Sequence, residues 1–195
     1  MSDLFDEAEG ATPLPPEDKL GLIPSHISTR AELNTEEQRN ITKAVIWATI
    51  KKRDILSITA IKDLHKLMYD NVWEWAGKFS KVHKRPIGVD PHMIEPDLQQ
   101  LINDVGYWIE HHTYSPDEIA VRFHHKLTVI HPFPNGNGRM SRQAADMLVR
   151  SLSGENFSWG RGNLRSANEI RRTYIDALRQ ADDHNLDALI AFARS

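Results

Sequence analysis

The stretch SPDEIAVRFHHKLTVIHPFPNGNGR, residues 115–139, contains the clearest helix signal of the chain and the loop that follows it. Ser115 can accept a hydrogen bond from the first turn, Pro116 suits the first helical position, and Glu118 completes a capping box. Apolar side chains then recur at helical spacing. The stretch therefore predicts a helix that runs directly up to a loop beginning at His131.

Similar apolar spacing predicts helices along the rest of the chain: from about residue 34, from about residue 57 to Gly77, over 98–109, after Asn137, and in two short pieces around 170–178 and 186–190. Residues 78–89 instead mix apolar side chains with Lys, Arg, Pro and Gly, which predicts a β-hairpin. The expected fold is all-α, a helical bundle with one small β-hairpin.

Length and composition predict one domain. The chain has 195 residues, of which 40% are hydrophobic, enough for a single buried core. We expect an irregular N-terminal arm over residues 1–33, rich in Pro and acidic side chains, and a helical domain over 34–195. Because the net charge is only −3 and basic residues alternate with acidic ones, we expect no direct contact with nucleic acid.

The chain contains no cysteine, which excludes disulfides and thiolate metal ligands. Neither a basic leader nor a long apolar run is present in the sequence. We therefore expect a cytoplasmic protein that does not interact with membranes.

The loop after the clearest helix has the composition of an anion site. Gly136 and Gly138 allow backbone conformations that other residues avoid and let a ligand approach closely. A helix is expected to begin directly after them, and the free N–H groups of its first turn attract negative charge. Arg139 and Arg142 are three residues apart, so they share a helix face and can bind one cluster of phosphate oxygens.

Two further residues of the loop suggest catalysis. His131 has a side chain whose ordinary pKa suits a general base near neutral pH. Asn135 offers an amide oxygen, a hard ligand of the kind that magnesium takes, although without the charge of a carboxylate. Together these residues favour a site for a polyphosphate with a bound metal ion and a base.

The sequence HPFPNGNGRMSR, residues 131–142, resembles the signature of the Fic/DOC family, with one departure at Asn135. The resemblance implies a protein adenylyltransferase, which moves AMP from ATP to a hydroxyl side chain of a target protein with Mg²⁺ or Mn²⁺. It implies that His131 is the base, Phe133 a buried anchor and Asn135 a metal ligand. It also implies that the backbone of Gly136, Asn137 and Gly138 forms a nest for the phosphates, and that Arg139 and Arg142 hold the leaving phosphates.

The resemblance extends over roughly residues 35–192. It implies that the predicted hairpin is a flap that docks the target by strand addition, with the edge formed by Lys78, Phe79, Ser80, Lys81 and Val82. Residues 21–24 and 29–34 resemble more narrowly the bacterial subgroup called mobile mystery protein B.

Two positions bear on the reaction that the resemblance implies. Most active members carry an acidic residue where this chain has Asn135, so we expect weaker metal binding and reduced activity. Doc-like members carry Lys where this chain has Gly138 and transfer a phosphate instead. Glycine therefore favours AMP transfer, with Doc-like phosphotransfer as an alternative.

Many relatives are inhibited by a helix with the pattern Ser or Thr, three residues, Glu, then Gly or Asn. Residues 35–40 resemble it but have Arg39 in place of the Glu, and residues 151–156 match it literally next to the motif helix. Autoinhibition stays open on this basis. An antitoxin-like inhibitor protein or a DNA-binding partner protein is a possible partner, in a toxin–antitoxin-like arrangement.

Readings outside this enzyme class also remain. The loop could belong to a nucleotide-binding regulatory module with little catalysis, although such a module needs no base like His131. The histidines at 111–112, 124–125 and 184 could bind zinc, but they lack a recognised ligand spacing and fit structural roles better.

Overall fold

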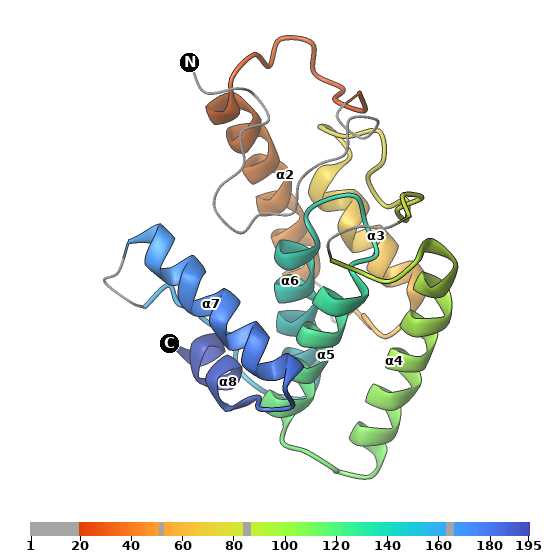
Figure 1. Ribbon diagram of the computed structural model, residues 1–195, viewed down its shortest axis with the longest axis vertical. Helices are drawn as coiled ribbons and strands as arrows, with labels where there is room; N and C mark the ends of the chain where they lie inside the picture. Colours follow the sequence, from red (N-terminus) through yellow and green to blue (C-terminus); the bar gives the residue numbers. More distant parts are fainter. Residues whose placement is uncertain (1–19, 51–52, 84–86, 163–165) are drawn as a thin grey trace.

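The computed structural model describes residues 20–50, 53–83, 87–162 and 166–195. These residues form seven α-helices and one short 3₁₀-helix (Figure 1): α2 (Arg30–Ile50), α3 (Ile58–Tyr69), η1 (Pro91–Met93), α4 (Ile94–Glu110), α5 (Pro116–Ile130), α6 (Asn137–Ser151), α7 (Ala167–Asp182) and α8 (Asp187–Arg194). None of the described helices is both long and apolar enough to span a lipid bilayer.

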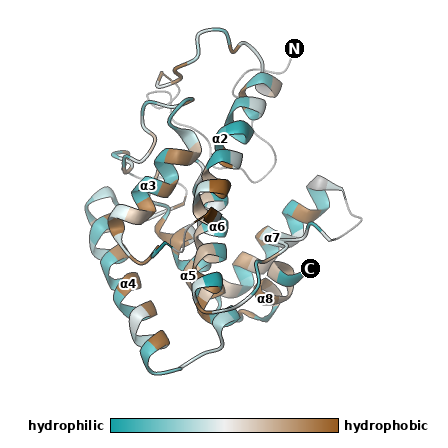
Figure 2. Ribbon diagram, turned by 180° about the vertical axis from the view of Figure 1, so that it is seen from behind, coloured by the Kyte–Doolittle hydropathy of each residue, from teal (hydrophilic) through white to brown (hydrophobic). Residues whose placement is uncertain are grey.

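Helices α5 and α6 form the centre of the bundle. They pack against each other, α4 adds to α5, and α2 and α3 pack on α6, while α7 and α8 pair beside α5 (Figure 1). Phe123 and Leu127 of α5 and Met140 and Ala144 of α6 are fully buried. Hydrophobic residues colour parts of α5 and α6 brown in Figure 2, whereas the first turns of α2 are teal. The hydrophobic core therefore fixes the two helix ends that flank the loop 131–136.

Helix α5 begins where the sequence predicts, but Glu118 does not complete the predicted capping box, because its Oε1 accepts hydrogen bonds from Arg122 at 3.0 and 2.7 Å. Ser115 has the extended backbone of an N-cap residue, and its Oγ accepts a hydrogen bond from the N–H of Glu118 at 3.3 Å. Pro116 occupies the first turn, where its missing N–H costs nothing. The cap fixes where α5 starts, and the core face then carries it to His131.

Helix α2 begins earlier than the predicted start near residue 34. The N–H of Thr29 donates to Glu32 Oε2 at 3.0 Å, and the N–H of Glu32 donates to Thr29 Oγ1 at 3.3 Å. These reciprocal bonds form a capping box. Thr35, next to the predicted start, lies inside the helix and donates its hydroxyl to the carbonyl of Ala31 at 2.8 Å.

Helix α3 ends sooner than predicted, at Tyr69 rather than at Gly77. The N–H groups of Val72 and Trp73 both donate to the carbonyl of Tyr69 at 2.9 Å, which closes tight turns after the helix. Leu22 forms an isolated antiparallel bridge with Trp73. The described end of the predicted N-terminal arm thus packs on the helical domain, whereas residues 1–19 lie outside the described residues.

The predicted β-hairpin over residues 78–89 is wrong. Residues 78–83 and 87–90 are irregular, no strand occurs among the described residues, and residues 84–86 fall in a gap of the description. The N–H of Ser80 donates to the carbonyl of Pro132 at 2.8 Å, and the N–H of Val89 donates to the carbonyl of Ile130 at 3.2 Å. These backbone donors are directed at the loop after α5, and so they do not form a ladder with each other.

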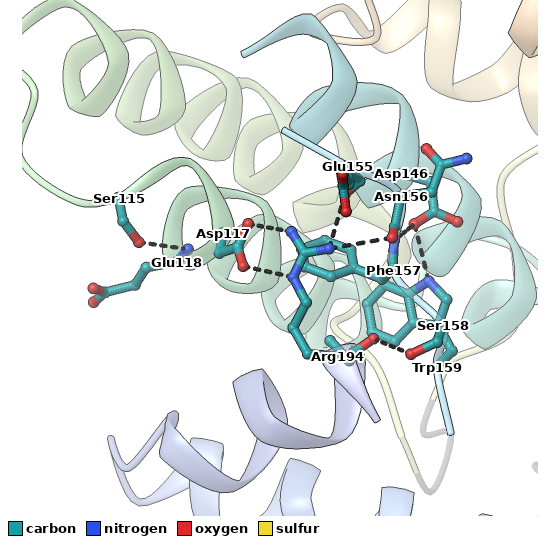
Figure 3. A network of polar contacts seen from close by, with 11 residues as sticks. Ser115, Asp117, Glu118, Asp146, Glu155, Asn156, Phe157, Ser158, Trp159 and Arg194 are labelled. Atoms are coloured by element: carbon teal, nitrogen blue, oxygen red, sulfur yellow. Dashed lines mark hydrogen bonds and ion pairs between the residues drawn. The ribbon is translucent and has the colours of Figure 1, made fainter. Parts of the chain in front are cut away.

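The C-terminal helix is held to the bundle by a polar network (Figure 3). Arg194 makes two hydrogen bonds to the carboxylate of Asp117 at the start of α5, one of them from Nε at 2.6 Å, and Nη1 donates to the carbonyl of Glu155 at 3.0 Å. Its guanidinium also lies 4.3 Å from the ring centroid of Phe157. The chain end is therefore tied to two distant segments.

Asp146 of α6 supports the same region. Its Oδ1 accepts hydrogen bonds at 3.1 Å from the N–H of Phe157 and from Nε1 of Trp159 (Figure 3). Burial raises the pKa of Asp146 to about 6, and these two hydrogen bonds oppose the shift. One carboxylate thus fixes residues 157–159, which follow α6.

Candidate active site

His131 stands at the junction of α5 and the loop. It is the C-cap residue of α5 in the left-handed conformation, with φ 52°, and its side chain is half-buried. Nδ1 lies 3.2 Å from the carbonyl oxygen of Thr128. A carbonyl can only accept, so Nδ1 carries the proton and Nε2 carries the lone pair. This tautomer is the one that a general base acting through Nε2 requires.

Gly88 explains how closely the neighbouring segment approaches His131. A Cβ at Gly88 would lie 2.9 Å from the Cβ of His131, and the residue has φ +110°. Residues 87–89 therefore cover one side of the histidine. The proximity places residues 87–89, the C-terminal part of the predicted hairpin, beside the candidate base.

Phe133 and Asn137 hold the loop in shape. Phe133 is fully buried, as expected for an anchor. The N–H of Phe133 donates to Asn137 Oδ1 at 2.9 Å, and Asn137 Nδ2 donates to the carbonyl of Phe133 at 2.8 Å. The Asn137 side chain is thus engaged within the loop, so only its backbone N–H can contribute to the phosphate nest that the resemblance implies.

Gly136 is the N-cap residue of α6, with φ +78° and no side-chain cap. A Cβ at this position would lie 2.5 Å from the hydroxyl oxygen of Tyr69, so the tyrosine excludes a side chain here. Tyr69 is fully buried, and burial raises its pKa to about 12, which keeps it neutral. The first-turn N–H groups of α6 therefore lie next to an uncharged tyrosine, which leaves their attraction for an anion uncompensated.

Arg139 forms an ion pair that the sequence did not predict. Its Nη1 donates to Glu37 Oε2 at 2.7 Å, and Glu37 Oε1 accepts a hydrogen bond from Trp73 Nε1 at 2.8 Å. Glu37 is buried, with 5% of its surface exposed. The guanidinium also lies 5.2 Å from the ring centroid of Tyr69. A carboxylate of α2 thus engages one of the two arginines expected to hold phosphates.

Glu37 identifies which part of α2 reaches the site. The inhibitory pattern places its acid at position 39, where this chain has an exposed arginine that pairs with Glu36 on the surface. The structure supplies an acid two positions earlier, and that acid reaches the first motif arginine. The literal match at 151–156 begins where α6 ends, about 20 Å from the loop at 1.5 Å per residue.

Arg142 lies against α7. Its guanidinium carbon is 5.1 Å from the ring centroid of Tyr174 on α7, and no carboxylate of the described residues forms an ion pair with it. The hydroxyl of Tyr174 is 3.1 Å from Nε2 of His124. Burial, followed by the charge of Arg142, lowers the pKa of His124 to about 3. Arg142 is therefore positioned by the uncharged Tyr174 side chain, which in turn contacts the neutral ring of His124.

His65 of α3 lies beneath the loop. Its ring stacks on Phe133 with centroids 3.7 Å apart, and Nε2 is 3.0 Å from the carbonyl oxygen of Asn135. Burial lowers the pKa of His65 to about 3, an effect that the hydrogen bond to Asn135 opposes. The contact comes from a residue 70 positions away in the sequence, and no motif in the sequence indicates it.

The loop offers few protein ligands to a metal ion. No group of three or more His, Cys, Asp or Glu side chains that could hold a metal ion occurs in the described part of the chain. Asn135 Oδ1 accepts from the N–H of Gly136 at 2.5 Å. In nucleotide sites magnesium takes most ligands from phosphates and water. Asn135 fits as one neutral ligand of a nucleotide-bound ion, and the described residues do not fit an ion held by protein alone.

The segment with the docking residues borders the loop. Phe79 packs against Phe133, with ring centroids 5.5 Å apart, and Ser80 is buried. Lys78 and Lys81 are exposed. The structure thus brings the predicted base, anchor, metal position, glycines and arginines together in one loop and helix end, and it places the predicted docking segment beside them.

Comparison with known protein families finds a match in the middle of the chain. The model of the Fic/DOC family matches residues 55–149, which include α3, α4, α5, the loop and most of α6. Residues 55–149 belong to the Fic/DOC family. Assignment to the subgroup called mobile mystery protein B rests only on the resemblance of residues 21–24 and 29–34, and it stays a prediction.

Named relatives of this Fic domain are protein adenylyltransferases. A protein of Aquifex aeolicus with the name "Probable protein adenylyltransferase" is 29% identical over 165 residues, covering 78% of this chain and 49% of the relative. The Aedes aegypti protein adenylyltransferase Fic is 25% identical over 149 residues, covering 73% of this chain and 28% of the relative. The chain therefore spans about half or less of the length of these curated relatives.

Solved structures share the fold. Bartonella tribocorum BepC with bound AMPPNP superimposes with a TM-score of 0.67 at 16% identity, covering 92% of this chain and 97% of BepC. Fic-1 of C. elegans gives a TM-score of 0.64 at 19% identity, covering 89% of this chain and 50% of Fic-1. The helical Fic architecture is thus shared at low sequence identity.

Proposed function

We propose that this chain transfers AMP from ATP to a hydroxyl side chain of a target protein. The observation that carries the proposal is the convergence, within one loop, of a base with a defined tautomer and a helix N-terminus flanked by two arginines. The names of the two relatives support the same reaction.

The chemistry follows from the positions of the residues. His131 Nε2 accepts the proton of the target hydroxyl, whose oxygen attacks the α-phosphorus of ATP. The bond between the α-phosphorus and its bridging oxygen breaks, and pyrophosphate leaves. Arg139, Arg142 and the first N–H groups of α6 hold the negative charge that develops on the leaving phosphates. A magnesium ion that accompanies the nucleotide would neutralise part of this charge.

Gly138 favours AMP transfer over phosphotransfer. A Cβ there would meet only the hydroxyl of Tyr174, at 3.7 Å, so the space in front of α7 stays open for the nucleotide. A long side chain at this position would fill that space and change how ATP lies.

Two labelled forms of ATP test the proposed function. We expect label on proteins of a bacterial lysate when the α-phosphate is labelled and none when the γ-phosphate is labelled, with an AMP-sized mass increase on the modified protein. Label from the γ-phosphate alone would indicate the Doc-like reaction. Absence of label from both forms, with ATP binding still measurable, would indicate the nucleotide-binding module instead.

Asn135→Asp is expected to raise the rate of transfer and to lower the Mg²⁺ or Mn²⁺ concentration needed for half-maximal rate. A carboxylate adds a negative charge to the metal ligand and binds a divalent cation more tightly than an amide does. Titration of the metal at fixed ATP measures the change. A metal-dependent rate that stays the same or falls would show that Asn135 is not a metal ligand.

We further propose that residues 78–82 dock the target. Lys78 and Lys81 are exposed and lie on a segment that already bonds to the loop through Ser80. The same proposal includes an antitoxin-like inhibitor or a DNA-binding protein as a partner. It also includes a cytoplasmic location, without direct binding to nucleic acid or to membranes. Salt-sensitive binding of the purified chain to DNA would speak against it.

A further inference from the structure

His65 connects the two parts of the proposed site. It is fully buried in α3, between the loop and the turn that ends at Gly77. The N–H of Gly77 donates to His65 Nδ1 at 2.9 Å, and His65 Nε2 faces the carbonyl oxygen of Asn135 at 3.0 Å. Gly77 directly precedes the docking segment, and Asn135 is the metal position. One imidazole ring thus touches the backbone at both places.

The two bonds require one tautomer. A backbone N–H can only donate, so Nδ1 holds the lone pair, and a carbonyl can only accept, so Nε2 holds the proton. The neutral ring with the proton on Nε2 satisfies both partners at once. The stack on Phe133, with planes inclined by 11°, fixes the ring orientation. An apolar side chain of similar size could fill this space, but it would leave both buried backbone groups without these bonds.

We propose that His65 is a positioning residue that sets the loop at Asn135 relative to the segment beginning at Gly77, and so holds the nucleotide and the target protein in register. The inference rests on the proposed function, since it assigns the two ends of the link to nucleotide and target. His65 itself touches neither substrate. It acts through the Asn135 carbonyl on one side and the Gly77 amide on the other.

Two amide substitutions separate the two bonds. The asparagine side chain reaches the place of Nδ1, so His65→Asn can keep an acceptor for Gly77 but loses the donor to Asn135. The glutamine side chain reaches the place of Nε2, so His65→Gln can keep the donor to Asn135 but loses the acceptor for Gly77. Both variants stay neutral and polar. His125→Gln is a matched control, because His125 is also buried and its Nε2 bonds to Asp182, at 2.7 Å.

We expect the two variants to fail in different ways. His65→Asn should weaken Mg·ATP binding by about threefold to tenfold, in both Kd and KM, because a single hydrogen bond is worth about 1 kcal/mol. His65→Gln should leave the Kd of Mg·ATP within about twofold and raise the KM for the target protein by about threefold to tenfold. His125→Gln should change neither constant.

Two measurements decide the inference without any transfer activity. Nitrogen NMR of the unmodified protein should show the lone pair of His65 on Nδ1 and the proton on Nε2. Hydrogen exchange of the amides from Gly77 to Val82 should become faster in His65→Gln and stay unchanged in His65→Asn. The opposite tautomer, or equal changes of ATP binding and exchange in both variants, would overturn the link. If transfer is absent but these results hold, the link stands and the proposed reaction fails.

Discussion

His131→Asn is expected to lower the rate of AMP transfer by about 10²–10⁴-fold, the range typical for loss of a general base. The structure places the lone pair of His131 on Nε2, because Nδ1 bonds to the carbonyl of Thr128. Asparagine removes that lone pair but tolerates the left-handed backbone that residue 131 adopts. Initial rates of label transfer from ATP labelled on the α-phosphate measure the effect.

ATP binding is the control for the His131 prediction. The arginines and the N-terminus of α6 do not depend on the His131 side chain, so the Kd of Mg·ATP should change by less than about threefold, a small fraction of the effect on rate. His131→Ala should give the same loss of rate with an additional loss of stability, because alanine lacks the tolerance of asparagine for positive φ. Transfer that persists in His131→Asn would exclude His131 as the base.

Glu37→Gln is expected to strengthen ATP binding and to raise the rate of transfer, by about tenfold in each case, the effect of one charge-assisted hydrogen bond. Glu37 Oε2 accepts from Arg139 Nη1 at 2.7 Å, so phosphate oxygens must compete with a fixed carboxylate for this arginine. Glutamine removes the charge and keeps a carbonyl oxygen for Trp73 Nε1, the partner of Glu37 Oε1. Calorimetric titration with Mg·ATP and initial rates measure the two effects.

The same substitution should lower the stability of the protein when no nucleotide is bound. Removal of one partner from a buried ion pair typically lowers the free energy of unfolding by about 3–5 kcal/mol. For the Glu37–Arg139 pair we expect a smaller loss. The Arg139 side chain is 36% exposed and so retains part of its hydration. The Tm of Glu37→Gln should therefore fall without nucleotide and rise more strongly than that of the unmodified protein when Mg·ATP is added.

Glu36→Gln provides the matched control for Glu37. It makes the same chemical change one residue earlier on α2, where Glu36 pairs with Arg39 on the surface. Neither ATP binding nor transfer should change in this variant. If Glu37→Gln folds but binds ATP no better than Glu36→Gln does, the Glu37–Arg139 pair supports the fold and does not compete with the nucleotide.

The Asn135→Asp and His65 variants address the two remaining parts of the site. The first concerns a residue whose role the sequence suggests, and the second concerns a residue that only the structure brings to the loop. Both depend on backbone contacts around Asn135, so His65→Asn and Asn135→Asp are expected to interact when combined, since neighbouring residues with shared partners are not additive.

The position of the loop between α5 and α6 could be predicted from the sequence, because helix caps and apolar spacing are local features. Ser115 caps the start of α5, the apolar spacing continues the helix up to His131, and Gly136 marks the start of α6, which leaves the loop between the two helices. The early start of α2 is also encoded locally, in the capping box that Thr29 and Glu32 form. The family resemblance rests on the same local pattern.

Residues 78–90 show where local patterns fail. The mixture of apolar side chains with Lys, Arg, Pro and Gly favours a hairpin, but Ser80 and Val89 donate to carbonyls of residues 130–132. Whether a backbone donor bonds within its own segment or to another depends on which acceptors the bundle brings near, and periodicity carries no information about that.

The sequence by itself determined the helical class, the loop at 131–139 and the family, because helix caps, glycine and apolar spacing act over a few residues. Only the tertiary structure decided that Glu37 engages Arg139, 102 residues away, and that His65 supports Asn135, 70 residues away. Such pairs arise because α2 and α3 pack on α6, and the helix packing depends on the whole core rather than on any segment.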